Sequence, residues 1–267
     1  MKNIILEFKK KRETGIPISV ITCYDYSFAR VFAQTEIDSI LVGDSMGMVI
    51  QGHGSTMPVT LEDIIYHTKA VCKGAQNKPI IADMPFLSYQ TSVEDGIRAA
   101  GTIMKETTAD CVKLEGDSDL VIELTHRLNE MGVPVMSHLG LTPQSFNTLG
   151  GYKVQGKTPE SRARMIQKSK ELVDAGAFSV LLEMIPESLG KEITESISVP
   201  TIGIGAGRHT SGQVLVMQDL LGMNDEFHPK FLKKYANLAG EVKKAVGLYH
   251  DDVVKRAFPE EENAFGD

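Results

Sequence analysis

The sequence lacks the features that define several classes of protein. It has only three cysteines, Cys23, Cys72 and Cys111, and no CxxC spacing. We therefore expect neither a disulfide framework nor a cysteine-rich zinc site, but reduced thiols in a cytoplasmic protein. No apolar stretch approaches the roughly 18 residues that a membrane span requires. The apolar run near the start, Ile4 to Leu6, is too short for the hydrophobic region of a signal peptide, so we expect none.

An excess of positive charge is also missing. The 28 Lys and Arg residues face 35 Asp and Glu residues, which gives a formal net charge of −7. This balance argues against charge-driven binding to nucleic acid or to anionic membranes, and we expect neither as a partner. Neither a P-loop nor an HExxH motif occurs. The hydrophobic share of 42% and the charged share of 24% are ordinary for a globular protein and exclude disorder as the main state.

Eight short apolar runs lie along the chain, most of them nearly continuously hydrophobic. Strands that are covered on both faces have this pattern, which is typical of a parallel sheet. The runs span residues 18–25, 39–44, 79–85, 111–116, 133–140, 178–185, 199–205 and 213–219.

Segments with a helical period separate most of these runs. Thr60 with Asp63, and Thr91 with Glu94, have the spacing of a capping box that opens a helix. The spacing predicts helices over residues 61–74, 92–106, 118–131, 159–175 and 187–197, with further helices over 2–12 and 231–249.

The number of apolar runs decides between two α/β architectures. Eight runs at about 28 residues per βα unit match a (β/α)8 TIM barrel, with the N-terminal helix capping one end. A doubly wound open sheet alternates strands and helices in the same way. The count of eight, and the positions of the polar residues, favour the barrel. No linker or repeat divides the chain, so we expect a single domain over residues 1–267.

Acidic residues lie at the carboxyl ends of adjacent predicted strands, where barrel enzymes place their active sites. Asp44 and Asp83 end the second and third runs, and Glu115 lies in the fourth. Buried together, these carboxylates would repel one another, and a divalent cation would remove that repulsion. All-oxygen ligation selects Mg²⁺ or Mn²⁺ over zinc. For each acid taken singly, capping a helix or pairing with a basic residue is an equal alternative.

Three further side chains share this end of the predicted barrel. Lys113 lies two residues before Glu115, so both face the same side of the strand, where Lys113 offers a cation to a carboxylate or keto oxygen. A structural Lys–Glu or Lys–Asp pair is the alternative. Glu183 has no basic neighbour in sequence, so burial would raise its pKa toward that of a general base. Otherwise it binds the backbone that follows. His138 is given a supporting role, because a lone histidine is more often a core residue.

A glycine-rich turn, residues 203–207, follows the seventh run. It lies where barrels commonly bind anions, although a simple turn before a helix explains it equally well.

Blocks along the chain resemble the ketopantoate hydroxymethyltransferase family, from about residue 16 to residue 260. The combination of these blocks is highly specific. They are TCYDYSFA (22–29), LVGDSMGMVIQGH (41–53), MPVTLEDIIYHTKAV (57–71), ADMPF (82–86), VKLEG (112–116), SHLGLTPQS (137–145), GGYKVQGK (150–157) and IGIGAG (202–207).

The resemblance implies an enzyme of pantothenate and coenzyme A biosynthesis. Members of the family transfer the one-carbon unit of 5,10-methylenetetrahydrofolate to 3-methyl-2-oxobutanoate and form 2-dehydropantoate. The resemblance also implies a (β/α)8 barrel, one Mg²⁺ per subunit, a cytoplasmic location and a homo-oligomer, commonly a decamer.

The family pattern assigns roles to particular residues of this chain. It implies that Mg²⁺ binds Asp44 and Asp83, with Glu115 close by as a further ligand, and that Glu183 is the proton acceptor. The residues expected to contact the 2-oxo acid are Asp44, Ser45, Asp83, Lys113 and His138. In the expected mechanism Mg²⁺ and Lys113 stabilise an enolate, Glu183 removes the C3 proton, and the enolate carbon attacks the opened iminium form of the folate.

Two other functions compete with this interpretation. A lyase or mutase of the phosphoenolpyruvate mutase and isocitrate lyase kind also pairs Mg²⁺ with 2-oxo acids on a barrel. Such an enzyme would be expected to have a reactive cysteine loop after the third or fourth strand, where this chain has MPFLSYQ (84–90) and LEGDSD (114–119). A non-catalytic barrel scaffold would be expected to have lost the acids at the strand ends, all of which are present.

Overall fold

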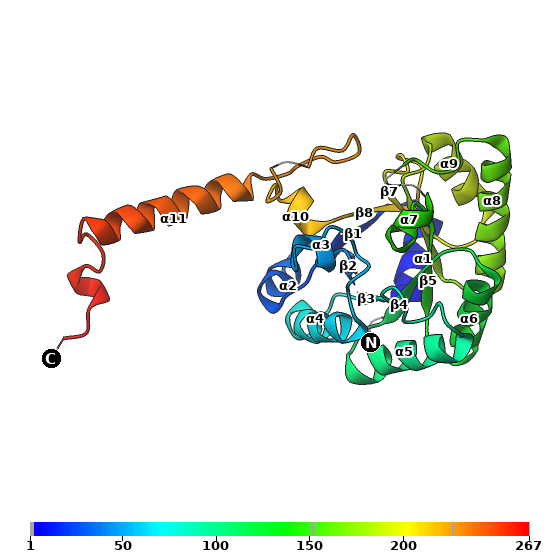
Figure 1. Cartoon of the computed structure of the whole chain (residues 1–267), viewed down its shortest axis with the longest axis horizontal. Helices are drawn as coiled ribbons and strands as arrows, with labels where there is room; N and C mark the ends of the chain where they lie inside the picture. Colours follow the sequence, from blue (N-terminus) through cyan, green and yellow to red (C-terminus); the bar gives the residue numbers. More distant parts are fainter. Residues whose placement is uncertain (1–2, 150, 152, 226, 267) are drawn as a thin grey trace. The chain divides into compact units, whose positions relative to one another are not determined.

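A closed barrel of eight parallel strands forms the larger of two compact units in the computed structural model, which describes residues 3–149, 151, 153–225 and 227–266. The units are Met1–Val216 and Met217–Asp267. Each strand of the larger unit pairs with the next, and β8 closes on β1 (Figure 1). At this closure Ile18 lies opposite Gly212. The strands are β1 (Ile18–Thr22), β2 (Ser39–Val42), β3 (Ile80–Asp83), β4 (Cys111–Glu115), β5 (Val135–Gly140), β6 (Ser179–Glu183), β7 (Thr201–Ile204) and β8 (Gly212–Leu215). The predicted (β/α)8 barrel is confirmed, and the open sheet is excluded.

Helices follow most of the strands, close to the predicted ranges. They are α1 (Ile4–Thr14), α2 (Tyr26–Phe32), α3 (Met46–Val49), α4 (Leu61–Ala75), α5 (Val93–Glu106), α6 (Asp119–Glu130), the 3-10 helix η1 (Pro143–Ser145), α7 (Phe146–Leu149), α8 (Pro159–Asp174) and α9 (Glu187–Ser196). Residue 2, which the helix predicted over 2–12 included, lies outside the described residues, as do residues 150 and 152 of the GGYKVQGK block.

The two predicted capping boxes have different outcomes. At α4 the Thr60 hydroxyl accepts from the Asp63 N–H at 3.1 Å, and the Asp63 carboxylate accepts from the Thr60 N–H at 2.9 Å, as predicted. The box predicted for Thr91 and Glu94 is wrong. Ser92 caps α5 instead, because its hydroxyl accepts from the N–H of Asp95 at 3.1 Å. Thr91 takes part through its hydroxyl, which donates to the Asp95 carboxylate at 2.8 Å.

An apolar layer fills the barrel interior at the end that α1 covers, which confirms the N-terminal capping helix. Phe8 of α1 is 1% exposed, and its ring centroid lies 5.9 Å from that of Phe178. The buried residues of this layer are Ile4, Phe8, Ile18, Val20, Leu41, Ile81, Cys111, Met136, Phe178, Leu181, Ile202 and Val214. We call this set the apolar layer. All three cysteines are free thiols; Cys23 and Cys111 are buried as expected, whereas Cys72 is only half-buried.

The smaller unit contains α10 (Met217–Leu220), α11 (Leu238–Val254) and a second 3-10 helix, η2 (Glu261–Asn263). The helix predicted over residues 231–249 begins later, at Leu238, because the Asn237 side chain caps it by accepting from the Gly240 N–H at 3.3 Å. Among the described residues, no helix combines the length and the apolar character needed to cross a membrane.

Candidate active site

The parallel register of the barrel brings the predicted site residues of three strands together. On β3 and β4, Asp83 lies opposite Lys113, and on β4 and β5, Glu115 lies opposite His138. Each of the four is at most 6% exposed. The strands therefore deliver these side chains to one buried group, as the sequence predicts.

Three carboxylates form the centre of this group. One oxygen from each of Asp44, Asp83 and Glu115 lies within 4.8 Å of the others. The backbone N–H of Asp44 donates to Asp83 Oδ2 at 3.2 Å, which holds the ends of β2 and β3 together. The grouping expected from the strand ends is present, and its donor atoms are all oxygen. We call Asp44, Asp83 and Glu115 the acid cluster.

Lys113 balances part of the charge of the acid cluster. Its Nζ lies 2.8 Å from Asp83 Oδ1 and 3.1 Å from Glu115 Oε1. The structural Lys–Asp and Lys–Glu pairs, considered above as the alternative role, are thus present in the structure. Burial by itself would lower the pKa of Lys113, but the charges of the acid cluster outweigh burial and raise it, so the ammonium stays charged.

Burial acts differently on the three acids, because their partners differ. Burial raises the pKa of Asp44 well above its ordinary value, and the charges of Asp83 and Glu115 raise it further. The pKa of Asp83 is raised by burial, which the attraction of Lys113 offsets only in part. Burial would also raise the pKa of Glu115, but Lys113 and His138 outweigh it and lower that pKa to about 2. The ionised forms of Asp44 and Asp83 are therefore disfavoured, and a nearby cation would stabilise them.

His138 connects the acid cluster to Glu183. Its Nδ1 lies 3.3 Å from Glu115 Oε1, and its Nε2 lies 3.4 Å from Glu183 Oε2. Burial and the charge of Lys113 would lower the pKa of His138, but Glu115 and Glu183 outweigh them and raise it to about 9. The Glu183 side chain is 19% exposed, against 2% for His138. Glu183 therefore has a basic partner that its neighbours in sequence do not reveal, and it lies nearer to solvent than the acid cluster.

Ser45 follows Asp44 directly, at the start of α3. Its hydroxyl lies 2.9 Å from the hydroxyl of Tyr24, a buried residue just beyond β1. Sequence reasoning did not single out Tyr24, although it belongs to the TCYDYSFA block.

Sequence reasoning also missed Tyr89 and Gln144, which contact the acid cluster from loops rather than from strand ends. The Gln144 side chain donates to Asp44 Oδ2 at 2.9 Å, and the Tyr89 hydroxyl accepts from the Glu115 N–H at 3.1 Å. Tyr89 lies in MPFLSYQ (84–90) and Gln144 lies in SHLGLTPQS (137–145). Both segments are named above, but the sequence assigned no role to either residue.

The glycine-rich turn after β7 packs against α9. The Glu187 side chain occupies the space that a Cβ at Gly207 would need, and Arg208 Nε donates to Glu187 Oε1 at 2.9 Å. These contacts favour the simple turn over an anion-binding loop.

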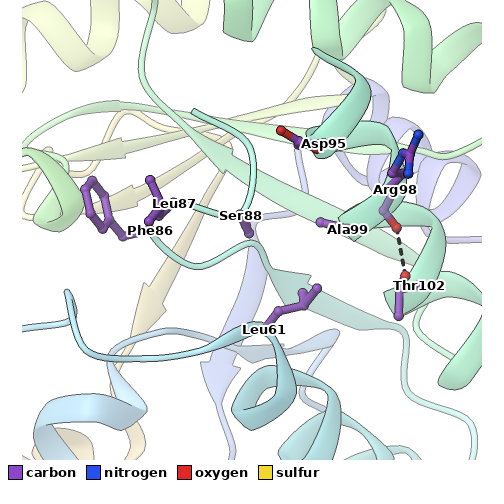
Figure 2. Close-up of a pocket in the computed structure, with 8 residues that line it drawn as sticks. All are labelled: Leu61, Phe86, Leu87, Ser88, Asp95, Arg98, Ala99 and Thr102. Carbon is purple, nitrogen blue, oxygen red and sulfur yellow. Dashed lines mark hydrogen bonds between the residues drawn. The ribbon is translucent and has the colours of Figure 1, made fainter. Parts of the chain in front are cut away.

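A separate pocket of about 330 Å³ lies beside the loop that follows Asp83, and Figure 2 shows its lining. Leu87 in this loop has a left-handed backbone (φ 67°), which is strained for a leucine, and it is 61% exposed. The lining residues are Leu61, Phe86, Leu87, Ser88, Asp95, Arg98, Ala99 and Thr102. The acid cluster is not part of this pocket.

An eight-stranded parallel barrel with a buried group of oxygen donors at its strand ends is the arrangement of a (β/α)8-barrel enzyme whose site suits a hard divalent cation. A family model described as ketopantoate hydroxymethyltransferase matches residues 2–261. The chain belongs to this family of transferases, whose pathway is pantothenate biosynthesis.

Relatives in two species agree with this membership. The chain is 68% identical over 267 residues to the 3-methyl-2-oxobutanoate hydroxymethyltransferase of Leptospira biflexa, with all of both chains covered. It is 56% identical to the enzyme of the same name from Leptospira interrogans, over 99% of this chain and all of the relative.

Solved structures with similar folds are much more distant in sequence. A 2,3-dimethylmalate lyase of the PEP mutase/isocitrate lyase superfamily has a TM-score of 0.61 at 14% identity, covering 99% of this chain and 93% of that one. A phosphonopyruvate hydrolase in complex with oxalate and Mg²⁺ has a TM-score of 0.63 at 10% identity, covering 98% and 93%. Likeness at this identity shows the fold alone and does not favour the lyase or mutase reaction.

Proposed function

We propose that the protein transfers the one-carbon unit of 5,10-methylenetetrahydrofolate to 3-methyl-2-oxobutanoate and forms 2-dehydropantoate. The observation that carries the proposal is the acid cluster, with Lys113 within 3.1 Å of two of its members, at the same end of the barrel as the His138–Glu183 pair. Membership of the family supplies the identity of the reaction.

The acid cluster fits one Mg²⁺ per subunit. Its donors are all carboxylate oxygens and are buried, and burial and mutual repulsion raise the pKa of Asp44. When its groups are ionised, the acid cluster and Glu183 carry more negative charge than Lys113 and His138, the cations that pair with them among the described residues, can balance. Asp44 and Asp83 would hold the ion, with Glu115 as the third ligand. A bound Mg²⁺ supplies a Lewis acid that draws electron density from the carboxylate and keto oxygens of the substrate.

The chain's own residues supply the remaining chemistry. The Ser45 hydroxyl and the Lys113 ammonium bind the 2-oxo acid, beside Asp44, Asp83 and His138. Lys113 also stabilises the negative charge that develops when the C3 proton leaves.

Glu183 accepts the C3 proton of the substrate, while His138, at 3.4 Å, fixes the orientation of its carboxylate. One C–N bond of the folate's methylene bridge opens, and the carbon that has lost its proton attacks the one-carbon unit. Water then replaces the remaining C–N bond and becomes the hydroxyl group of the product. Tetrahydrofolate leaves, with one nitrogen protonated by the proton that Glu183 accepted and the other by a proton of the water.

We further propose that the protein works in the cytoplasm as a homo-oligomer, which in this family is commonly a decamer. The three free thiols support a reducing compartment.

Proton NMR of 3-methyl-2-oxobutanoate in D₂O tests the proposal. With protein and Mg²⁺ we expect the C3 proton signal to disappear, and we expect EDTA to stop the loss. Added methylenetetrahydrofolate should then yield 2-dehydropantoate. Exchange without product would overturn the folate as co-substrate. Neither exchange nor product from folded protein would overturn the transferase mechanism altogether.

A further inference from the structure

We propose that Gln144 is a positioning residue that sets the geometry of the acid cluster for its cation, and that Tyr89 holds Gln144 in place. This inference rests on the proposed function, because it concerns the same cation site. Gln144 is 6% exposed and lies in η1, the 3-10 helix that follows β5. It therefore reaches the acid cluster from outside the strands that carry the acids.

Gln144 contacts all three chain segments that supply the acids. Its Nε2 donates to Asp44 Oδ2 and to the carbonyl oxygen of Met84, each at 2.9 Å. Its backbone N–H donates to Glu115 Oε2 at 3.1 Å. Met84 follows Asp83 directly, so one residue fastens the ends of β2, β3 and β4 to one another.

The contacts fix which end of the Gln144 amide faces the acid cluster. The Met84 carbonyl and the Asp44 carboxylate can only accept hydrogen bonds, so the amide nitrogen must face them. The amide oxygen accepts from the Tyr89 hydroxyl at 2.8 Å and from Gln90 Nε2 at 2.9 Å. A rotated amide would lose these bonds and bring its oxygen against two other acceptors.

Tyr89 links Gln144 to Glu115 and so completes the hydrogen-bond network around the acid cluster. It is 0% exposed, and its hydroxyl accepts from the Glu115 N–H at 3.1 Å while donating to Gln144 Oε1. The hydrogen bonds thus run from Glu115 through Tyr89 and Gln144 to Asp44. Buried networks in which every donor and acceptor is used hold their members in one arrangement.

A fixed arrangement of ligands favours cation binding. Mg²⁺ and Mn²⁺ demand defined positions of their oxygen ligands, and groups that orient those ligands typically change affinity by about 10- to 100-fold when removed. Because the Gln144 side chain donates to Asp44 and to the carbonyl oxygen of the residue after Asp83, its loss should weaken cation binding without removing any ligand.

The test is Mn²⁺ binding, measured by the electron paramagnetic resonance signal of free Mn²⁺, with no substrate present. We expect Gln144→Met, which keeps the length of the side chain but not its hydrogen bonds, to raise the Kd for Mn²⁺ by about 10- to 100-fold. Tyr89→Phe should raise it less, because Gln90 still donates to the amide oxygen. The matched control is Gln167→Met on α8 of the same barrel, which removes a glutamine that donates to Glu171 rather than to the acid cluster, and which should leave the Kd unchanged.

The outcomes separate this inference from the proposed function. Equal Kd values for wild type, Gln144→Met and Tyr89→Phe would overturn the positioning role and leave the cation site standing. No Mn²⁺ binding by the wild type would overturn the cation site, and with it this inference. Thermal unfolding without metal establishes that each variant is folded. If Gln144→Met does not fold, Tyr89→Phe, which loses a single hydroxyl, decides the question in the same assay.

Discussion

Two layers of the barrel interior differ sharply, although the same strands build both. Along each of four strands, a residue of the apolar layer is followed two positions later by a charged or titratable residue on the same face. The pairs are Ile81 and Asp83 on β3, Cys111 and Lys113 on β4, Met136 and His138 on β5, and Leu181 and Glu183 on β6. The alternation of side chains along a strand makes this possible, because every second residue faces inward. Each of these strands thus contributes one side chain to the apolar layer and another to the candidate active site.

The two layers make opposite contributions to stability. Burying a Leu, Ile or Met side chain contributes roughly 1.5–3 kcal/mol, so the apolar layer stabilises the fold. We call Asp83, Lys113, His138 and Glu183, together with Asp44 and Glu115, the charged layer. Buried charges cost stability unless they are paired. Lys113 and His138 compensate the negative charge of the acids in this layer only in part. Changes in the apolar layer should therefore affect mainly stability, and changes in the charged layer mainly the chemistry.

The largest effect is expected at Glu183. Replacing it by Gln keeps its size but removes the proton acceptor, so kcat should fall by about 10²- to 10⁴-fold. The free energy of unfolding should change little, because the side chain is partly exposed and contributes nothing to the apolar layer. Steady-state kinetics and urea unfolding measure the two quantities. A variant that unfolds, or one that retains nearly normal kcat, would show that Glu183 is not the base.

Two residues earlier on the same strand, Leu181→Ala should have the reverse effect. Leu181 is 3% exposed within the apolar layer, so truncation should lower the free energy of unfolding by about 2–5 kcal/mol. The kcat of the folded fraction should stay within a few-fold of the wild-type value. Urea unfolding, with kinetics at a temperature where the variant is folded, checks both statements. A fall in kcat as large as that of Glu183→Gln would mean that the layers are not separable.

The smallest effect belongs to a charge outside both layers, at the start of α4. Burial would raise the pKa of Asp63 slightly, but hydrogen bonds from Thr60 outweigh it and lower that pKa. A lowered folded-state pKa contributes stability that is present above the unfolded pKa and is lost as pH falls through the folded one. Asp63→Asn should therefore destabilise the protein at pH 7 by about 0.5 kcal/mol, an amount limited by solvent exposure. The difference from wild type should shrink progressively as the pH falls below the unfolded-state pKa of about 3.9 and through the lowered folded-state pKa.

Unfolding measured across this pH range is the check. A difference between Asp63→Asn and wild type that persists at pH 3 would show that the hydrogen bonds of the capping box, rather than the charge of Asp63, produce the effect.

The sequence predicted most of the barrel because its signals are local. Near-continuous apolar runs located all eight strands, and the strand-end acids located the charged layer, since parallel strands end at one rim. The Thr91 box failed because two adjacent hydroxyl residues compete for one cap and Ser92 holds it. A single domain over residues 1–267 stays a prediction, since the chain divides into two units after residue 216.

Local sequence patterns could not predict the contacts between segments that are far apart in the chain. The pairing of His138 with Glu183 depends on how β5 and β6 align, and no spacing within either strand reveals it. The hydrogen bond from Gln144 to Asp44 joins residues 100 positions apart. Short connecting segments such as η1, which carries Gln144, have no periodic signal, so the roles of their residues emerge only from the folded chain.

One NMR experiment tests the division between the layers most directly. The rate of C3-proton exchange of 3-methyl-2-oxobutanoate in D₂O with Mg²⁺ is compared for wild type, Glu183→Gln and Leu181→Ala, at a temperature where all three are folded. Wild type and Leu181→Ala should exchange at similar rates, and Glu183→Gln should exchange at least about 100-fold more slowly. Exchange by Glu183→Gln at the wild-type rate would contradict the assignment of proton transfer to the charged layer's Glu183.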